Sequence, residues 1–169
     1  MRAEYTFVSH WRVPASAARA WAEIERMIAA SDPVTDPARR ERTDPRPAWW
    51  PGVDVVQPAT ELAPGEQLTI AVRSPLGYRL RVRLMIDDVD PGWALTAQSR
   101  GDLRGRGRIV VEPDGDEAAV ITFHWDVVTE RRWMNATAWL LRPVFERAHG
   151  HVMRAGERGI RTEFARRDA

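Results

Sequence analysis

The sequence contains no cysteine and no lysine. The absence of cysteine excludes disulfide bonds, thiol nucleophiles and thiolate metal sites from every later interpretation. All 25 basic residues are therefore arginine, which fits biased codon usage as well as selection and indicates no function.

Long apolar runs are also missing. No segment approaches the roughly 20 apolar residues of a membrane-spanning helix, and the first residues lack the apolar core of a signal peptide. The net charge of +1 gives no strong field that would attract nucleic acid or an acidic membrane. We therefore predict a cytoplasmic protein with no membrane span and no nucleic-acid partner. Its 169 residues, taken as 1–169, suit a single domain.

Seven segments have the composition and periodicity of β-strands. The clearest is Tyr78–Asp88, where apolar residues alternate with three arginines, as in a half-exposed antiparallel strand. Turn signals such as Asp90-Pro91-Gly92 separate the later strands without an intervening helix, which predicts a meander. The seven segments are Glu4–Val13, Val53–Pro58, Gln67–Arg73, Tyr78–Asp88, Trp93–Ser99, Leu103–Glu112 and Ala118–Thr129.

Helical patterns occur at two places. Apolar residues at helical spacing follow Ser16, a suitable N-cap, and predict a short helix from about Ala17 to Ile28. A second pattern continues from about Trp133 to about Phe164, with a bend expected at Pro143. Between the first helix and the next strand, the segment 31–48 holds four prolines. It is a candidate lid, with a short helix around Pro37–Arg42 as an alternative to a plain loop.

A terminal helix this long needs a broad surface to pack on, and only the strands can provide it. We therefore predict an α+β fold in which a curved antiparallel sheet of about seven strands wraps around the C-terminal helix. One or two short helices follow the first strand. The part of the long helix upstream of Pro143 is apolar nearly all round, so we expect it to cover a cavity. The downstream part carries a narrower apolar stripe and should pack tightly on the sheet.

Four strings carry a resemblance to a known family. They occur in the order Trp49-Trp50-Pro51-Gly52-Val53, Gly101–Gly107, Trp125-Asp126-Val127 and Arg154–Gly159. Together they resemble the polyketide cyclase/dehydrase and lipid-transport family of the helix-grip (START-like, Bet v 1-like, SRPBCC) superfamily. The resemblance spans essentially the whole chain and implies a β-α-α-β6-α topology with a hydrophobic internal cavity. Members bind lipids, sterols, polyketides and isoprenoid-like compounds, and only some are enzymes, so the resemblance indicates fold more than function.

The predicted function is binding of one small hydrophobic molecule, polyketide-, aromatic- or lipid-like, in the internal cavity. Eight apolar or aromatic residues are the expected walls, together with two glycines that either leave room for the ligand or allow strong sheet curvature. The predicted ligand-binding residues are Trp21, Trp50, Leu84, Leu95, Gly105, Gly107, Phe123, Trp125, Trp139 and Leu140.

Whether the protein is an enzyme is left open by the sequence. The resemblance suggests cyclisation or dehydration, for which the best-placed polar candidates are Tyr78, Ser99, Arg142 and His149. A single Glu146-x-x-His149 pair falls short of a metal-ligand set, so we predict no metal and no cofactor. The pair His124 and Asp126 could act as base and orienter only if Trp125 lay outside; we expect Trp125 inside.

The rival interpretation is a non-catalytic carrier or a partner-binding module. Arginines alternate along two strands and would form a basic stripe on the outer face if those strands were neighbours. These arginines are Arg79, Arg81, Arg83, Arg104, Arg106 and Arg108. A solvated face is the more ordinary explanation. The sequence predicts neither the identity of the ligand nor the oligomeric state.

Overall fold

The computed structural model describes residues 4–29, 49–129 and 132–169, with the backbone alone for 132–141. The predicted lid at 31–48 lies outside the described residues. So do the side chains of Trp139 and Leu140, two of the predicted cavity residues.

The described chain forms one seven-stranded sheet and two helices. Along the chain these are β1 (Glu4–Val13), α1 (Ala17–Ile28), β2 (Val53–Gln57), β3 (Gln67–Arg73), β4 (Arg79–Asp90), β5 (Ala94–Gly101), β6 (Leu103–Pro113), β7 (Ala119–Thr129) and α2 (Arg132–Arg167). The strand order is β1-β7-β6-β5-β4-β3-β2, and all neighbours are antiparallel. The predicted meander runs from β2 to β7, and β1 adds to the edge beside β7.

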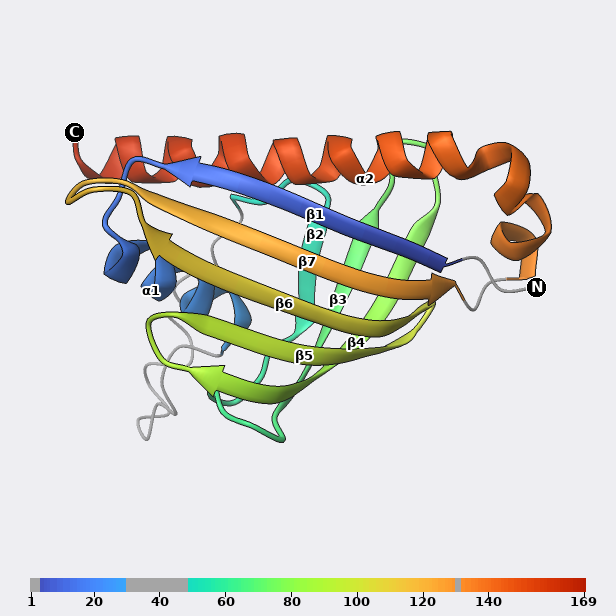
Figure 1. Ribbon diagram of the computed structural model, residues 1–169, viewed down its shortest axis with the longest axis horizontal. Helices are drawn as coiled ribbons and strands as arrows, with labels where there is room; N and C mark the ends of the chain where they lie inside the picture. The colour runs from blue at the N-terminus through green and yellow to red at the C-terminus, as the bar shows by residue number, and fades with distance from the viewer. Residues whose placement is uncertain (1–3, 30–48, 130–131) are drawn as a thin grey trace, which may run out of the picture.

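The sheet is strongly curled, and α2 lies along its open side (Figure 1). The strands β1, β7, β6 and β5 run roughly along the length of the molecule, whereas β4, β3 and β2 turn steeply behind them. Seen in this view, α2 passes over both sheet edges. This arrangement is the predicted α+β architecture of a curved sheet around a long C-terminal helix.

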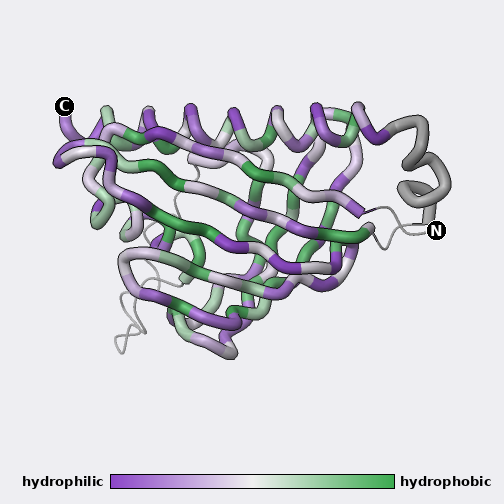
Figure 2. Tube along the Cα trace, in the orientation of Figure 1, coloured by the Kyte–Doolittle hydropathy of each residue, from purple (hydrophilic) through white to green (hydrophobic). Residues whose placement is uncertain are grey.

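Alternating side chains determine which face of each strand points toward α2. In β4, Leu80 and Val82 are buried on the concave face, while Arg81 and Arg83 are exposed on the other. Green and purple segments accordingly alternate along the strands in Figure 2. The register continues this pattern across β6 and β7, where Gly107 pairs with Trp125. Apolar burial thus fixes the register, because a slip of one residue would exchange the faces.

The helix α1 packs one apolar face against the concave side of the sheet. Ser16 is its N-cap and accepts a hydrogen bond from the backbone N–H of Arg19 at 3.4 Å. Trp21, Ile24 and Ile28 are buried together in the main core. Neither described helix is long and apolar enough to cross a membrane.

The C-terminal half of α2 is held very close to the turn that follows the undescribed segment. A Cβ on Gly159 would lie 1.5 Å from the backbone oxygen of Trp49, and one on Gly156 would lie 2.5 Å from the ring of Trp11. The Nε1–H of Trp50 donates to the backbone oxygen of Val152 at 3.0 Å. The string Trp49-Trp50-Pro51-Gly52 and the glycines of α2 are therefore two sides of one docking contact.

Candidate functional site

A cavity of about 200 Å³ lies between the concave face of the sheet and α2. Every strand contributes to its wall, and most of the lining is aliphatic or aromatic. The lining includes Phe7, Val55, Leu68, Ile70, Leu80, Leu84, Leu95, Leu103, Ile109, Phe123, Trp125 and Val127, closed by Phe145, Ala148, Val152 and Met153 of α2. The main apolar core includes Trp11, Ile24, Ile121 and Phe164, which do not line the hollow, and it shares residues such as Leu68, Ile70 and Leu95 with the cavity wall.

The predicted wall residues divide into three groups. Six of them line the cavity: Trp50, Leu84, Leu95, Gly107, Phe123 and Trp125. Trp21, on the buried face of α1, lies in the core and does not line the cavity. Gly105 does not line the cavity either. The side chains of Trp139 and Leu140 lie outside the described residues.

The two glycines of β6 have different roles. A Cβ on Gly105 would lie 1.9 Å from the backbone oxygen of Asp126, so Gly105 allows β6 and β7 to approach closely. A Cβ on Gly107 would meet only the backbone oxygen of His124, at an ordinary 3.7 Å. Gly107 faces the cavity and leaves volume in it. The open space at Gly107 agrees with the first explanation, whereas close strand approach at Gly105 is a role that the sequence did not predict.

The part of α2 that covers the cavity includes residues downstream of Pro143. Among the described side chains, Phe145, Val152 and Met153 close the hollow, whereas Gly156 lies in close contact with the rings of Trp11 and Trp50. The expectation that the downstream half packs tightly throughout is therefore wrong for its first turns. The apolar stripe of this part of α2 shows which side chains are buried. It does not show whether they face a hollow or pack on the sheet, because both give the same sequence pattern.

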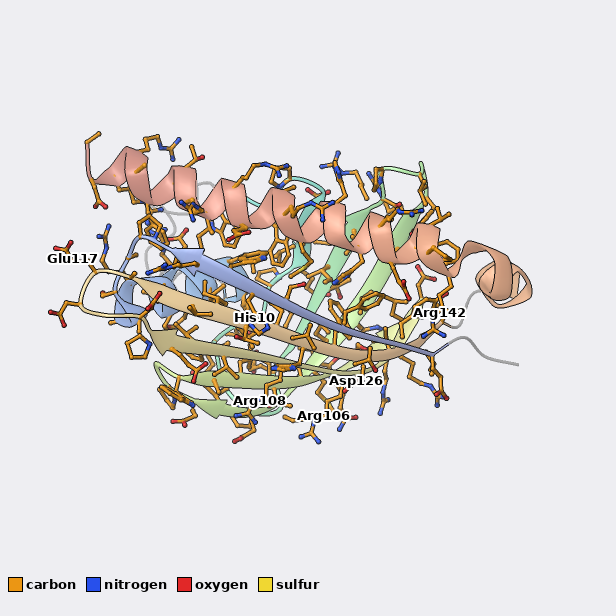
Figure 3. The ribbon with its side chains drawn as sticks, turned by 45° about the horizontal axis from the view of Figure 1, so that its top comes forward. His10, Arg106, Arg108, Glu117, Asp126 and Arg142 are labelled. Carbon is orange, nitrogen blue, oxygen red and sulfur yellow. The ribbon has the colours of Figure 1, made fainter. Side chains whose placement is uncertain are left out.

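The four polar candidates for catalysis do not converge on one point. Tyr78 and His149 line the cavity. Ser99 is buried opposite Gly105 in the sheet, outside the wall. Arg142 is the first residue of α2 whose side chain is described, and it is exposed (Figure 3) and donates to the backbone oxygen of Glu4 at 3.1 Å.

The sequence interpretation missed the aromatic residues of β1. Tyr5 and Phe7 line the cavity, and Trp11 lies behind it with its ring centroid 4.4 Å from that of Phe123. A usable signal was present, since Tyr5, Phe7, Ser9, Trp11 and Val13 alternate with polar or exposed residues. Applying the period of two to this strand would have placed all five on the inner face.

His149 is the most perturbed ionisable group of the cavity wall. Its ring stacks on that of Phe7 with centroids 4.0 Å apart, and its Nε2 atom is buried without a described hydrogen-bond partner. Burial in this apolar setting lowers the pKa of His149 to about 4. The imidazole is therefore neutral near pH 7.

We expect this histidine to make the fold sensitive to acid. The unfolded chain takes up a proton at His149 below about pH 6.5, whereas the folded chain takes it up only near pH 4. The free energy of unfolding therefore decreases as the pH is lowered from about 6.5 to about 4. The loss attributable to this group should reach about 2–3 kcal/mol at pH 4.5. Urea unfolding of the wild type and of His149→Phe at pH 7 and pH 4.5 measures it.

The variant His151→Gln, at an exposed position on the same helix, is the matched control. Its stability should decrease between pH 7 and pH 4.5 by as much as that of the wild type. An equal acid loss in wild type and His149→Phe would show that His149 is not the responsible group.

The convex face of the sheet carries the charged residues. His124 and Asp126 are exposed there, and Trp125 lines the cavity, as expected. His124 also borders the hollow beside Gly107, but Asp126 does not, so the two side chains do not face the site as a pair. In Figure 3 the labelled Arg106 and Arg108 extend away from α2. The two arginine rows are not neighbours, because β5 lies between β4 and β6. Among the described residues, no group of three His, Cys, Asp or Glu side chains could hold a metal ion.

No protein-family model and no curated protein matches the sequence, but solved structures do. The Zhui aromatase/cyclase from Streptomyces sp. R1128 is 14% identical with a TM-score of 0.65, over 99% of this chain and 97% of that one. A START superfamily protein from Mycobacterium smegmatis is 12% identical with a TM-score of 0.60, over 94% and 95% of the chains. Norcoclaurine synthase from Thalictrum flavum, in complex with dopamine and hydroxybenzaldehyde, is 15% identical with a TM-score of 0.51, over 90% and 85%.

At these identities the likeness concerns the fold. The chain shares the predicted helix-grip fold with these proteins.

Proposed function

We propose that this helix-grip protein binds one small hydrophobic molecule, aromatic or polyketide-like, in the cavity beneath α2. The observation that supports this function is a hollow of about 200 Å³ whose wall is built mainly from aliphatic and aromatic side chains. Close-packed interiors leave few voids larger than a water molecule, so a hollow of this size calls for an occupant. An engineered apolar cavity of about 150 Å³ in another protein binds benzene, which makes one or two aromatic rings a suitable size.

Filling the hollow from the sheet side should abolish binding without unfolding the protein. In Gly107→Leu the new side chain enters the space that Gly107 leaves open, while its Cβ keeps an ordinary contact with the sheet. We expect naphthalene, measured by equilibrium dialysis, to bind at least about tenfold more weakly than to the wild type, a loss of about 1.4 kcal/mol.

Gly107→Ala is the control, because one methyl group removes little volume, and it should keep most of the affinity. A folded Gly107→Leu protein that binds naphthalene as well as the wild type would exclude the cavity as the binding site. No binding of any hydrophobic probe to the wild type would leave the rival, a surface-interaction module, in its place.

Catalysis of the cyclase or dehydrase type is a second, finer proposal. The named aromatase/cyclase among the structural neighbours supports it, and so do the two wall residues Tyr78 and His149, which could move protons. Acid–base work requires both groups within hydrogen-bonding reach of the substrate. A substrate turned over by the wild type and bound but not turned over by Tyr78→Phe or His149→Phe would support an enzyme. Lipid transport and a cytoplasmic location stay predictions.

The alternative carrier or partner-binding role would use the convex face. Arg83 of β4 and Arg100 of β5 are directly paired and exposed, so basic side chains continue from β4 across β5. Acidic groups offset part of this charge, since Asp87 lies 4.0 Å from Arg106 and Asp54 lies 3.3 Å from Arg73. The cavity is the more specific feature, because exposed arginines are an ordinary solution to solubility.

A further inference from the structure

Three buried polar atoms in the cavity wall have no hydrogen-bond partner among the described residues. They are the hydroxyl oxygen of Tyr5, the indole Nε1 of Trp125 and the Nε2 of His149. A buried polar atom left without a partner costs about 1–3 kcal/mol. Native structures contain few such atoms, and each needs an explanation.

All three groups adjoin the same residue, Phe7. Tyr5 precedes Phe7 by two positions on the same face of β1, and the two rings stack with centroids 5.7 Å apart. Trp125 is the direct partner of Phe7 on β7. The ring of His149 lies against Phe7 from α2. The unpartnered atoms thus come from three elements that meet at one region of the wall, which we call the Phe7 end of the cavity.

Other tryptophans show that the fold can satisfy an indole N–H when no ligand is needed. Trp50 also lines the cavity, but its Nε1–H donates to the backbone oxygen of Val152. Trp49 donates to a carboxylate oxygen of Glu23 at 2.9 Å. Trp125, on the same wall as Trp50, has no such partner. Trp11 and Ser99 also have unpartnered atoms, but they lie outside the wall and no ligand explains them.

The charges near the Phe7 end favour an uncharged ligand. Burial keeps His149 neutral at pH 7, so it supplies no positive charge. Arg142 lies on the outer side of Tyr5, 5.4 Å from the centre of its ring, and is occupied by Glu146 and the backbone of Glu4. Arg108 also borders the cavity, but its side chain is exposed, so a carboxylate placed here would be desolvated without a buried cation to offset the cost.

On the basis of the function proposed above, we propose that the ligand is an uncharged aromatic molecule with an oxygen acceptor, such as an aryl ketone. Its ring fills the apolar part of the hollow, and its oxygen accepts hydrogen bonds at the Phe7 end from Trp125 and Tyr5. The acceptor is required because an indole N–H can only donate.

Three matched two-ring probes test the proposal at pH 7 by equilibrium dialysis. Naphthalene has no polar group, 2-acetylnaphthalene has a ketone oxygen, and 2-naphthoate has a carboxylate in the same position. We expect 2-acetylnaphthalene to bind at least about tenfold more tightly than 2-naphthoate, because the buried carboxylate lacks a cation.

Two substitutions identify the donors. In Tyr5→Phe and in Trp125→Phe, the ratio of 2-acetylnaphthalene affinity to naphthalene affinity should fall about three- to tenfold, since each variant removes one donor. The ratio is used because Trp125→Phe also removes apolar contact area, which weakens the binding of both probes by a similar factor. The matched control is Trp50→Phe, where the ratio should stay unchanged because that N–H is already bonded to Val152.

The outcomes separate this inference from the proposed function. If all three probes bind and the ratio is unchanged in Tyr5→Phe and Trp125→Phe, the cavity binds apolar molecules but the polar end is overturned. If 2-naphthoate binds most tightly, the uncharged class is overturned as well. If naphthalene and 2-acetylnaphthalene both fail to bind the folded wild type, the proposed function falls and the inference with it.

Discussion

Replacing Gly159 with alanine should destabilise the protein by about 3 kcal/mol or more, at the upper end of overpacking effects. The added Cβ would lie 1.5 Å from the backbone oxygen of Trp49, and backbone cannot swing aside as the end of a flexible side chain can. To relieve the clash, α2 must move away from the turn that Trp49 begins. Chemical denaturation monitored by circular dichroism measures the loss.

Gly150→Ala is the matched control on the same helix. The nearest atom to its added Cβ is the guanidinium nitrogen of Arg154 at 3.1 Å, an exposed and flexible group that can shift. Alanine is also preferred over glycine inside a helix by about 1 kcal/mol. Gly150→Ala should therefore be neutral or stabilising. Equal effects of the two substitutions would show that α2 does not depend on close approach at Gly159.

The close approach at Gly159 also has a consequence for the cavity. Gly156 and Gly159 let the C-terminal half of α2 approach the tryptophan turn, and the preceding turns at 145–153 close the hollow. Larger side chains beneath those turns would fill the space, and Gly107 on β6 is the position where the sheet leaves it empty. Glycines therefore contribute to the hollow in two ways: Gly156 and Gly159 allow α2 to dock on the tryptophan turn, and Gly107 leaves space in the wall.

The fold was predictable from the sequence because its signals are local. Alternation in Tyr78–Asp88, turn residues such as Asp90-Pro91-Gly92, and a helix that continues to the C-terminus each depend on neighbouring residues alone. The strands Glu4–Val13 and Gln67–Arg73 have the predicted bounds, and the other described strands differ from prediction by two residues or fewer at either end. Only β1 pairs far from its place in the chain, and the resemblance to the helix-grip superfamily implied that sheet.

The site was less predictable, because it depends on which inward residues meet a hollow and which meet other side chains. Trp21 and Trp50 were both predicted to be wall residues, yet one lies in the core and the other on the wall. Gly105 and Gly107 are two residues apart on one face, yet one serves strand approach and the other leaves volume. Periodicity identifies the buried face but does not distinguish packed from unpacked positions on it.

Removing the carboxylate of Glu23 should cost about 3 kcal/mol. Glu23 is buried in α1 with 2% of its surface exposed, and it accepts hydrogen bonds from Arg26, from Arg167 at 2.8 Å and from Trp49 at 2.9 Å. Breaking a buried pair by deleting one member typically costs about 3–5 kcal/mol, and the partly exposed guanidinium groups place this case at the lower end. Urea unfolding of Glu23→Ala against the wild type measures the loss.

This carboxylate joins α1, Trp49 and the end of α2, which also meet in the apolar core. Arg167 belongs to the last turn of α2, and attraction to Glu23 and Glu163 raises its pKa despite partial burial. Glu25→Ala, at an exposed position of α1, is the control and should change stability by less than about 0.5 kcal/mol. In a double-mutant cycle, Glu23→Ala and Arg167→Ala should lose less together than the sum of their separate losses. Strict additivity would show that the two side chains do not stabilise the fold as a pair, and that the end of α2 is fixed by Gly159 and the tryptophan turn alone.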